Sequence, residues 1–342
     1  MAIETAKFGD LYGQSVQLFT LKNRNGISVS LSDCGARLVA INVPDKNGNF
    51  DNIVLGFDKI NTYIEKDRYI GAVVGRVANR IADATFILND KVYTLAKNNN
   101  GNCLHGGAYG FDFKIWKARI LKEGLSPAIK FSYYSCDKEE GFPGNVWVDV
   151  VYELTEDNCL LMWFSGCSDK DTLLNLSNHA YFNLLGAGND ILGHTLQLQA
   201  DYITAIDKFL IPTGELLPVE NTPYDFRTPK TIGKDIMQAL PGYDHNFVLN
   251  EGRTFTAKLS EKTTGRSLEI KSSQPGIQVY TAGHFDGSAI ASNGKPMPKF
   301  GGVALETQHF PDSIHKSQFP SVVLKVGERY EEQVSYKFGL EG

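Results

Sequence analysis

The sequence has no run of about 18 consecutive apolar residues, so it offers no segment suited to a membrane-spanning helix. It also lacks an excess of basic charge, because 34 lysine and arginine residues stand against 39 aspartate and glutamate residues, a formal net charge of −5. Nucleic-acid binding usually leaves a basic patch in the sequence. The segment from Met1 to Asp10 lacks the basic and then apolar pattern of a secretory signal. We therefore predict no membrane partner and no nucleic-acid partner.

Cysteine is scarce, with five residues at Cys34, Cys103, Cys136, Cys159 and Cys167. An odd number without a C-x-x-C pair argues against both a disulfide framework and a zinc ribbon. We expect buried free thiols in a reducing compartment, which places the protein in the cytoplasm.

Several local motifs of catalysis and ligand binding are missing. The sequence has no H-E-x-x-H pair and no EF-hand loop, so no local spacing predicts a metal. It has no G-x-S-x-G nucleophile elbow. The segment Gly75–Ile81 carries two arginines but lacks the glycine spacing and the Lys-Ser/Thr pair of a phosphate loop. No local spacing thus predicts a metal, although one could still assemble from separated histidines.

What the sequence does contain is glycine, at 33 residues, and many short β-rich runs separated by Gly, Asn and Asp. Residues 85–94 read as a hairpin with Asn89-Asp90 at the turn. Helical signals are confined to 59–67 and 232–240. Short strands at close spacing are typical of a large sandwich or barrel. Because no linker or repeat divides the chain, we predict one all-β domain over residues 1–342 with very little helix.

Two histidines have unusual neighbours. His105 precedes two glycines in Leu104–Gly107, in a loop whose backbone can approach a ligand closely. His179 lies in Asn178–Leu184, beside Asn and Tyr side chains that can hydrogen-bond a ring nitrogen or a sugar. A histidine titrates near neutral pH and suits proton transfer in both directions. The alternatives are an ordinary turn residue for His105 and a satisfied core residue for His179.

Acidic and amide candidates follow along the chain. Glu306 lies at the end of the apolar run Val303–Gln308, where burial would raise the pKa of its carboxyl toward the range of a general base. If the strand has already ended there, Glu306 is simply solvated. Asp244 follows a Pro-Gly turn and could bind hydroxyls or cap that turn. Asn79 and Arg80 offer hydrogen-bond donors, or belong to a solvated charged turn.

In this order, these segments resemble the aldose 1-epimerase (galactose mutarotase) family. Each motif is weak by itself, whereas many in register over nearly the whole chain are specific. The matching segments are Gly35–Arg37, Asn52–Phe57, Gly75–Ile81, Leu104–Gly107, Asn178–Leu184, Ile211–Glu215, Tyr243–Phe247, Pro275–Tyr280, Leu305–Gln308 and Phe319–Pro320. The resemblance implies an antiparallel β-sandwich with an open cleft on its concave face. It also implies interconversion of the α and β anomers of free aldohexoses such as galactose and glucose, without a cofactor.

The resemblance also implies roles for single residues. Glu306 would be the base at the C1 hydroxyl and His179 the acid at the ring oxygen, with His105 as a second histidine of the cleft. We expect the nearby carboxylate to raise the pKa of His179, so that Glu306 is ionised and His179 protonated. The sugar-binding positions are Asn79, Arg80, Asp244 and Gln278, and an aromatic such as Tyr181 or Phe285 would stack on the sugar. We expect a small aldose as the binding partner. We expect the protein to be a monomer or a homodimer.

Three other functions compete with this interpretation. A glycoside hydrolase normally uses two carboxylates at a defined separation, whereas here the pairing is histidine with glutamate. A relative acting on hexose 6-phosphates would need cations for the phosphate, which Arg76 and Arg80 could supply. A sugar-binding protein without catalysis is disfavoured because both His179 and Glu306 are present.

Overall fold

The computed structural model of the chain describes residues 3–66 and 69–341. Within these residues the one α-helix is α1 (Ile60–Lys66), and the other helical segments are short 3₁₀ turns. Every ladder between the named strands is antiparallel. The predicted all-β antiparallel sandwich is confirmed, and none of the helices in the described ranges has the length and apolar character to cross a bilayer.

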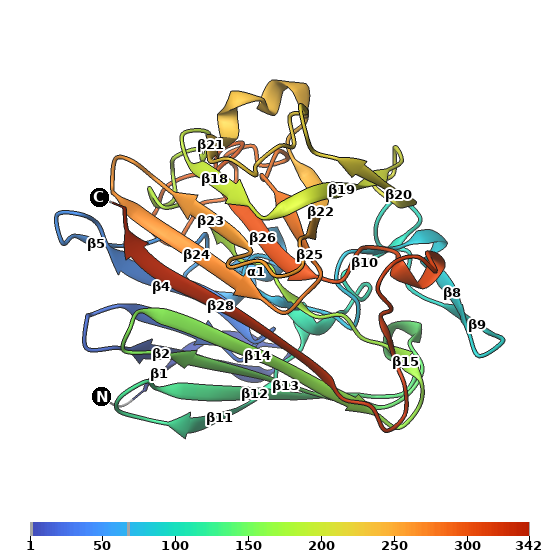
Figure 1. Cartoon of the computed structure of the whole chain (residues 1–342). Helices are drawn as coiled ribbons and strands as arrows, with labels where there is room; N and C mark the ends of the chain where they lie inside the picture. The colour runs from blue at the N-terminus through green and yellow to red at the C-terminus, as the bar shows by residue number, and fades with distance from the viewer. Residues whose placement is uncertain (1–2, 67–68, 342) are drawn as a thin grey trace.

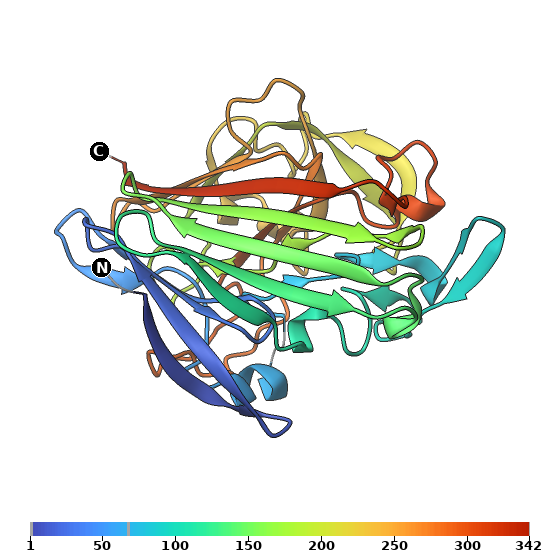
Figure 2. The same ribbon diagram turned by 90° about the horizontal axis from the view of Figure 1, so that it is seen from below.

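The largest layer is a nine-stranded sheet. Its strands in spatial order are β11 (Lys117–Lys122), β12 (Ala128–Ser135), β13 (Val146–Leu154), β14 (Cys159–Ser168), β28 (Tyr330–Leu340), β24 (Arg266–Ser272), β23 (Ala257–Ser260), β18 (Thr195–Leu198) and β21 (Lys230–Thr231). The long strands of this layer run side by side, with the C-terminal strand β28 between β14 and β24 (Figures 1 and 2).

A six-stranded sheet carries much of the candidate site. Its strands in order are β17 (Tyr181–Phe182), β26 (Val303–Gln308), β25 (Gly276–Tyr280), β22 (Asp244–Leu249), β19 (Ala200–Ile206) and β20 (Pro212–Pro218). A five-stranded sheet at the N-terminal end holds β1 (Glu4–Leu11), β2 (Gln14–Lys22), β3 (Ser28–Ser32), β4 (Arg37–Pro44) and β5 (Phe50–Asn52). Four two-stranded ladders complete the fold: β6 (Val73–Val74) with β16 (Ser177–Asn178), β7 (Arg80–Ile81) with β10 (Cys103–Leu104), β8 (Thr85–Leu88) with β9 (Lys91–Thr94), and β15 (Thr172–Leu173) with β27 (Val323–Leu324).

Apolar alternation builds the core. Along β13, Val146, Val148 and Val150 are buried while the residues between them are more exposed, as expected for a strand with one face on a core. The largest buried cluster takes side chains from all three large sheets, for example Val150, Val279 and Leu31. The three sheets therefore share one continuous apolar interior, which fixes the six-stranded sheet that carries the site.

Of three local predictions, two are confirmed and one is wrong. The hairpin β8–β9 forms as predicted, because Asn89 and Asp90 take the positive φ values, 51° and 59°, of a two-residue turn (Figure 1). The helix predicted at 59–67 is α1, although Asp67 lies outside the described residues. The helix predicted at 232–240 is wrong, since two separate 3₁₀ turns form there. The amides of Ile232 and Gly233 donate instead to carbonyls of the segment before β18.

The cysteines depart in part from expectation. All five are free, and Cys34, Cys103 and Cys159 are buried as predicted. Cys136 and Cys167 are exposed. Cys167 is at an outward-facing position near the end of β14, and Cys136 directly follows β12.

Candidate active site

A cleft of about 450 Å³ opens over one face of the six-stranded sheet. Its lining includes six of the seven predicted site residues: Asn79, Arg80, His105, His179, Asp244 and Glu306. The seventh, Gln278, is 4% exposed and donates a hydrogen bond of 2.6 Å from Nε2 to Oδ1 of Asp244. Tyr181 also lines the cleft, whereas Phe285 packs behind it at 5.4 Å between ring centroids. Residues separated by more than two hundred positions thus meet in one hollow.

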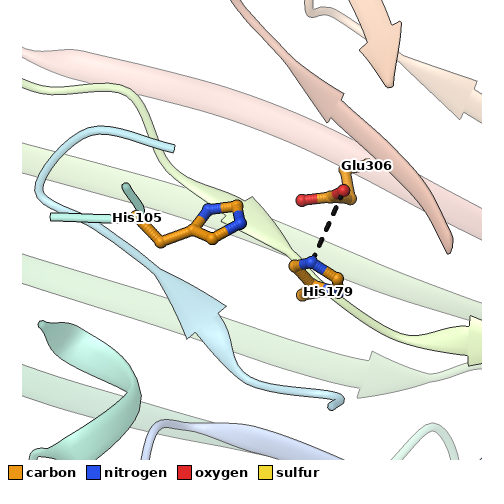
Figure 3. Close-up of side chains that lie close together, drawn as sticks. All are labelled: His105, His179 and Glu306. Atoms are coloured by element: carbon orange, nitrogen blue, oxygen red, sulfur yellow. Dashed lines mark ion pairs between the residues drawn. The ribbon is translucent and has the colours of Figure 1, made fainter. Parts of the chain in front are cut away.

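His179 and Glu306 both line this cleft, and their side chains face each other (Figure 3). Nε2 of His179 lies 3.6 Å from Oε1 of Glu306. Glu306 belongs to β26, and His179 lies between β16 and β17. Because β17 pairs with β26, the two residues come together. The exposed fractions are 4% for His179 and 2% for Glu306. A histidine and a carboxylate this close, in a cleft, can give protons to and take protons from a bound molecule.

The backbone around His179 is fixed from both sides. Its amide donates to the carbonyl of Ala72, and its carbonyl accepts from the amide of Gly71, both at 2.9 Å. Asn178 donates from Nδ2 to the carbonyl of Gly71, also at 2.9 Å. Asn183 donates to two backbone carbonyls, so neither asparagine bonds the imidazole as the sequence had suggested. Their amides hold the segment that places the ring.

Burial sets the proton affinities of this pair. Desolvation lowers the pKa of His179 to about 4. Desolvation, with a smaller contribution from the negative charge of Asp244, raises the pKa of Glu306 well above its ordinary value, and Arg80 opposes that rise. The expectation that Glu306 would raise the pKa of His179 is therefore wrong for the empty cleft, because loss of water outweighs the attraction between the two groups. Burial therefore favours the uncharged form of both groups in the empty cleft.

The structure fixes how His105 can act. The backbone amide of Asn79 donates to Nδ1 of His105 at 3.1 Å. A neutral imidazole that accepts at Nδ1 carries its proton on Nε2, so we assign His105 as a hydrogen-bond donor toward the cleft. His105, His179 and Glu306 place one ligand atom each within 4.8 Å of one another. Two imidazoles and a carboxylate can hold zinc. In His105, however, Nδ1 accepts from a backbone amide, so binding a metal through Nε2 would require loss of the proton assigned there.

Tyr69 packs on both histidines and was not predicted. Its ring lies 6.1 Å from that of His179 in a stacked arrangement and 4.7 Å from that of His105. Other lining residues that the sequence did not single out are Ile64, Lys66, Asn99 and His284. They carry no local signal, because each becomes part of the site only when segments far apart in the sequence meet.

The two arginines of Gly75–Ile81 have different environments. Arg80 lines the cleft, and its Nε donates to Oδ1 of Asn99 at 3.2 Å. Arg76 is 2% exposed and points away into the protein. Its guanidinium donates to the Ser135 hydroxyl and to the backbone carbonyls of Pro143 and Gly144. Arg76 is therefore a structural residue and cannot bind a phosphate in the cleft.

Comparison with known proteins places the chain. Residues 17–337 match the family model described as aldose 1-epimerase. The chain belongs to the aldose 1-epimerase family. Within this family it is 40% identical over 346 residues to the galactose mutarotase of Bos taurus, covering 99% of each chain. It is 40% identical over 345 residues to the aldose 1-epimerase of Haemophilus influenzae, covering 98% of this chain and 99% of that protein.

Solved structures of the aldose 1-epimerase family share the fold. The aldose epimerase homologue from C. elegans superposes with a TM-score of 0.89 at 29% identity, covering 95% of this chain and 99% of that one. The galactose 1-epimerase from Lactobacillus acidophilus superposes with a TM-score of 0.88 at 26% identity, covering 99% of both chains.

Proposed function

We propose that the protein is an aldose 1-epimerase that interconverts the α and β anomers of free aldohexoses such as galactose and glucose. The observation that carries the proposal is the contact of 3.6 Å between His179 and Glu306 in a polar cleft. Membership of the aldose 1-epimerase family supports the same reaction.

Ring opening needs one base and one acid. Glu306 takes the proton of the C1 hydroxyl as the C1–O double bond forms. The bond from C1 to the ring oxygen breaks at the same time, and the ring oxygen takes a proton from His179. The reacting form of the pair thus has Glu306 ionised and His179 protonated, so the pair gains one proton from the C1 hydroxyl as it gives another to the ring oxygen.

Ring closure reverses these transfers. Rotation about the C1–C2 bond presents the other face of the aldehyde to the C5 hydroxyl. His179 takes back the proton of the C5 hydroxyl as the oxygen of that hydroxyl attacks C1. Glu306 returns a proton to the carbonyl oxygen on C1, which becomes the hydroxyl of the new anomer. No net proton is gained or lost, so the pair is ready for the next sugar without a cofactor.

The remaining cleft residues hold the sugar in this proposal. The Nε2–H of His105 is a donor for an oxygen near C1. Asp244, fixed by Gln278, accepts from hydroxyls, while Asn79 and Arg80 donate to them. Hydroxyl groups that leave water need such partners, because an unpaired buried polar group costs about 1–3 kcal/mol. Tyr181 offers a ring for the apolar face of the sugar.

The proposal extends to the setting of the protein. We treat the chain as one domain, since its largest core takes side chains from three sheets. Five free thiols, two of them exposed, favour a reducing compartment such as the cytoplasm. A monomer or a homodimer is expected, and sedimentation equilibrium distinguishes the two.

Polarimetry of freshly dissolved α-D-galactose and α-D-glucose tests the activity. The buffer is kept dilute because dissolved acids and bases catalyse the same change. A faster approach to an unchanged final rotation is expected with the protein. Glucose 6-phosphate serves as the competing substrate, and we expect it to react more slowly, because Arg76 is not available to its phosphate. An unchanged rate with both free sugars would contradict the proposal.

A further inference from the structure

The two oxygens of the Glu306 carboxyl have different surroundings. Oε1 faces His179 across 3.6 Å. Oε2 is buried and has no hydrogen-bond partner among residues 3–66 and 69–341. A base that must carry negative charge in a site shielded from water needs donors, because burial without them raises the pKa of its carboxyl. The side of Glu306 turned away from His179 is therefore the place to look for groups that support its charge.

Buried amide side chains cross the sheet next to Glu306. The strand register pairs Glu306 of β26 with Gln278 of β25, and Gln278 with Asn246 of β22. Gln308 lies two positions after Glu306 in β26, and alternation along the strand puts it on the same face. The exposed fractions are 1% for Asn246 and 0% for Gln308. The side-chain nitrogen and oxygen of both residues have no hydrogen-bond partner in the described part of the chain.

Gly276 keeps space open between these amides. It pairs with Gln308 across the ladder of β25 and β26. A Cβ atom at Gly276 would lie 2.5 Å from Oδ1 of Asn246 and 3.0 Å from the ring of Phe310. Oδ1 of Asn246 therefore leans over Gly276 toward the strand that carries Gln308. Phe310, which packs edge-on against Phe319 at 5.2 Å, borders this space.

Four unpaired polar atoms under an aromatic cover are costly unless something bonds them, and buried polar groups are normally satisfied by protein or by ordered water. We propose that Asn246 and Gln308, with ordered water between them, line a compartment behind Glu306 and donate hydrogen bonds toward its Oε2. These bonds stabilise the ionised carboxylate that takes the C1 proton. Asn246 and Gln308 are positioning residues in this scheme, which rests on the proposed epimerase activity.

Other charged or titratable groups also act on Glu306. They are His105, His179, Asp244, Arg80 and Tyr336. Asp244 opposes ionisation of Glu306, and Arg80 favours it. None of them is hydrogen-bonded to Oε2 within the described ranges. The amides of Asn246 and Gln308 therefore supply a contribution that the known cleft residues do not.

Gln308→Met tests the proposal, since it keeps the length of the side chain and removes its donor. Loss of the donor raises the proton affinity of Glu306, so the limb of the kcat/KM profile that reports ionisation of Glu306 is expected to move to higher pH by about one unit. kcat at neutral pH is expected to fall about tenfold with little change in KM, because the ionised form becomes scarcer. Asn246→Leu is a second variant with the same expected direction, should the first fail to fold.

Thr256→Val is the matched control. Thr256 is 0% exposed, its hydroxyl has no hydrogen-bond partner in the described residues, and it precedes β23 of the other sheet. Its variant is expected to keep the wild-type pH profile. Folded Gln308 and Asn246 variants with an unshifted profile would overturn the inference, and so would a control that shifts equally. Failure of the wild type itself to accelerate mutarotation would instead contradict the proposed function.

Discussion

The nine-stranded and the six-stranded sheets are both antiparallel and both pack one face on the core, but their opposite faces differ. The outer face of the nine-stranded sheet carries partly exposed ion pairs, such as Lys130 with Asp149 at 2.9 Å and Lys258 with Glu269 at 3.1 Å. The second face of the six-stranded sheet carries Glu306 with almost no exposure. Water screens the first set of charges and weakens their interaction. Withdrawal of water from the second set shifts proton affinities and makes chemistry possible.

The largest expected difference is in kcat, between variants in the cleft and a variant on the outer face of the nine-stranded sheet. Glu306→Gln and His179→Ala are each expected to lower kcat by about 10²–10⁴, the usual scale for loss of a general acid or base. Asp149→Asn, on the outer face of the nine-stranded sheet, is expected to leave kcat unchanged. Polarimetric kcat values for folded proteins make the comparison. Near-wild-type turnover in both cleft variants would remove the proposed acid and base.

The reverse contrast concerns stability. Phe131 of β12 is fully buried and packs edge-on against Phe19 and Tyr152 at 5.9 and 6.0 Å. Phe131→Ala is expected to lower the free energy of unfolding by about 3–5 kcal/mol, with kcat of the folded protein unchanged. Urea unfolding measures the loss. Lys130→Ala, its outward-facing neighbour, is the control and is expected to cost under about 1 kcal/mol. A large fall in kcat for folded Phe131→Ala would contradict the separation of stability and activity between the two sheets.

Two buried histidines are expected to make stability depend on pH. Burial lowers the pKa of both His179 and His194 to about 4. In the unfolded chain the pKa of histidine is about 6.5. Below that pH the unfolded chain binds more protons than the folded one, so stability falls as pH drops from about 6.5 toward 4. His194, before β18, is expected to contribute on the order of 3 kcal/mol of this loss.

His194→Gln is therefore expected to flatten the acid dependence of the unfolding free energy while leaving the pH profile of activity in place. Thermal or urea unfolding at several pH values provides the measurement. A pH dependence of stability identical to wild type would show that His194 does not stay neutral in the fold.

The smallest expected effect is on substrate binding. Asp244→Ala removes a carboxylate that Gln278 holds at 2.6 Å and that faces the cleft. We expect KM for galactose to rise about tenfold or more, with a smaller change in kcat, because hydrogen bonds to charged groups contribute about 1.5–3 kcal/mol. Glu215→Ala, an exposed carboxylate on β20 of the same sheet, serves as the control. An unchanged KM would remove Asp244 from the binding set.

Sequence reasoning succeeded where chemistry is local. The turn at Asn89-Asp90 has residues that accept positive φ, and the burial of Glu306 follows from the apolar residues around it. The helix expected at 232–240 failed because the amides of Ile232 and Gly233 found acceptors in a segment about forty positions earlier. Local helix signals cannot compete with such long-range partners in a chain rich in antiparallel pairing.

The distinction between Arg76 and Arg80 could not be predicted. They are four positions apart in one motif, yet one guanidinium is enclosed by carbonyls of residues 135–144 and the other opens to the cleft. The same holds for Asn246 and Gln308, whose partners depend on how three strands align. Residues such as Tyr69 and His284 gave no signal, because their place in the site comes entirely from loop packing.

The position of β28 has a consequence for how the protein is made. This strand of 11 residues pairs with β14 on one side and with β24 on the other. Until residues 330–340 have left the ribosome, β14 and β24 are both open edges, and open edges invite pairing with other chains. The nine-stranded sheet can therefore close only after β28 has been made, and a nascent chain that stalls before β28 would expose two unpaired strands at once.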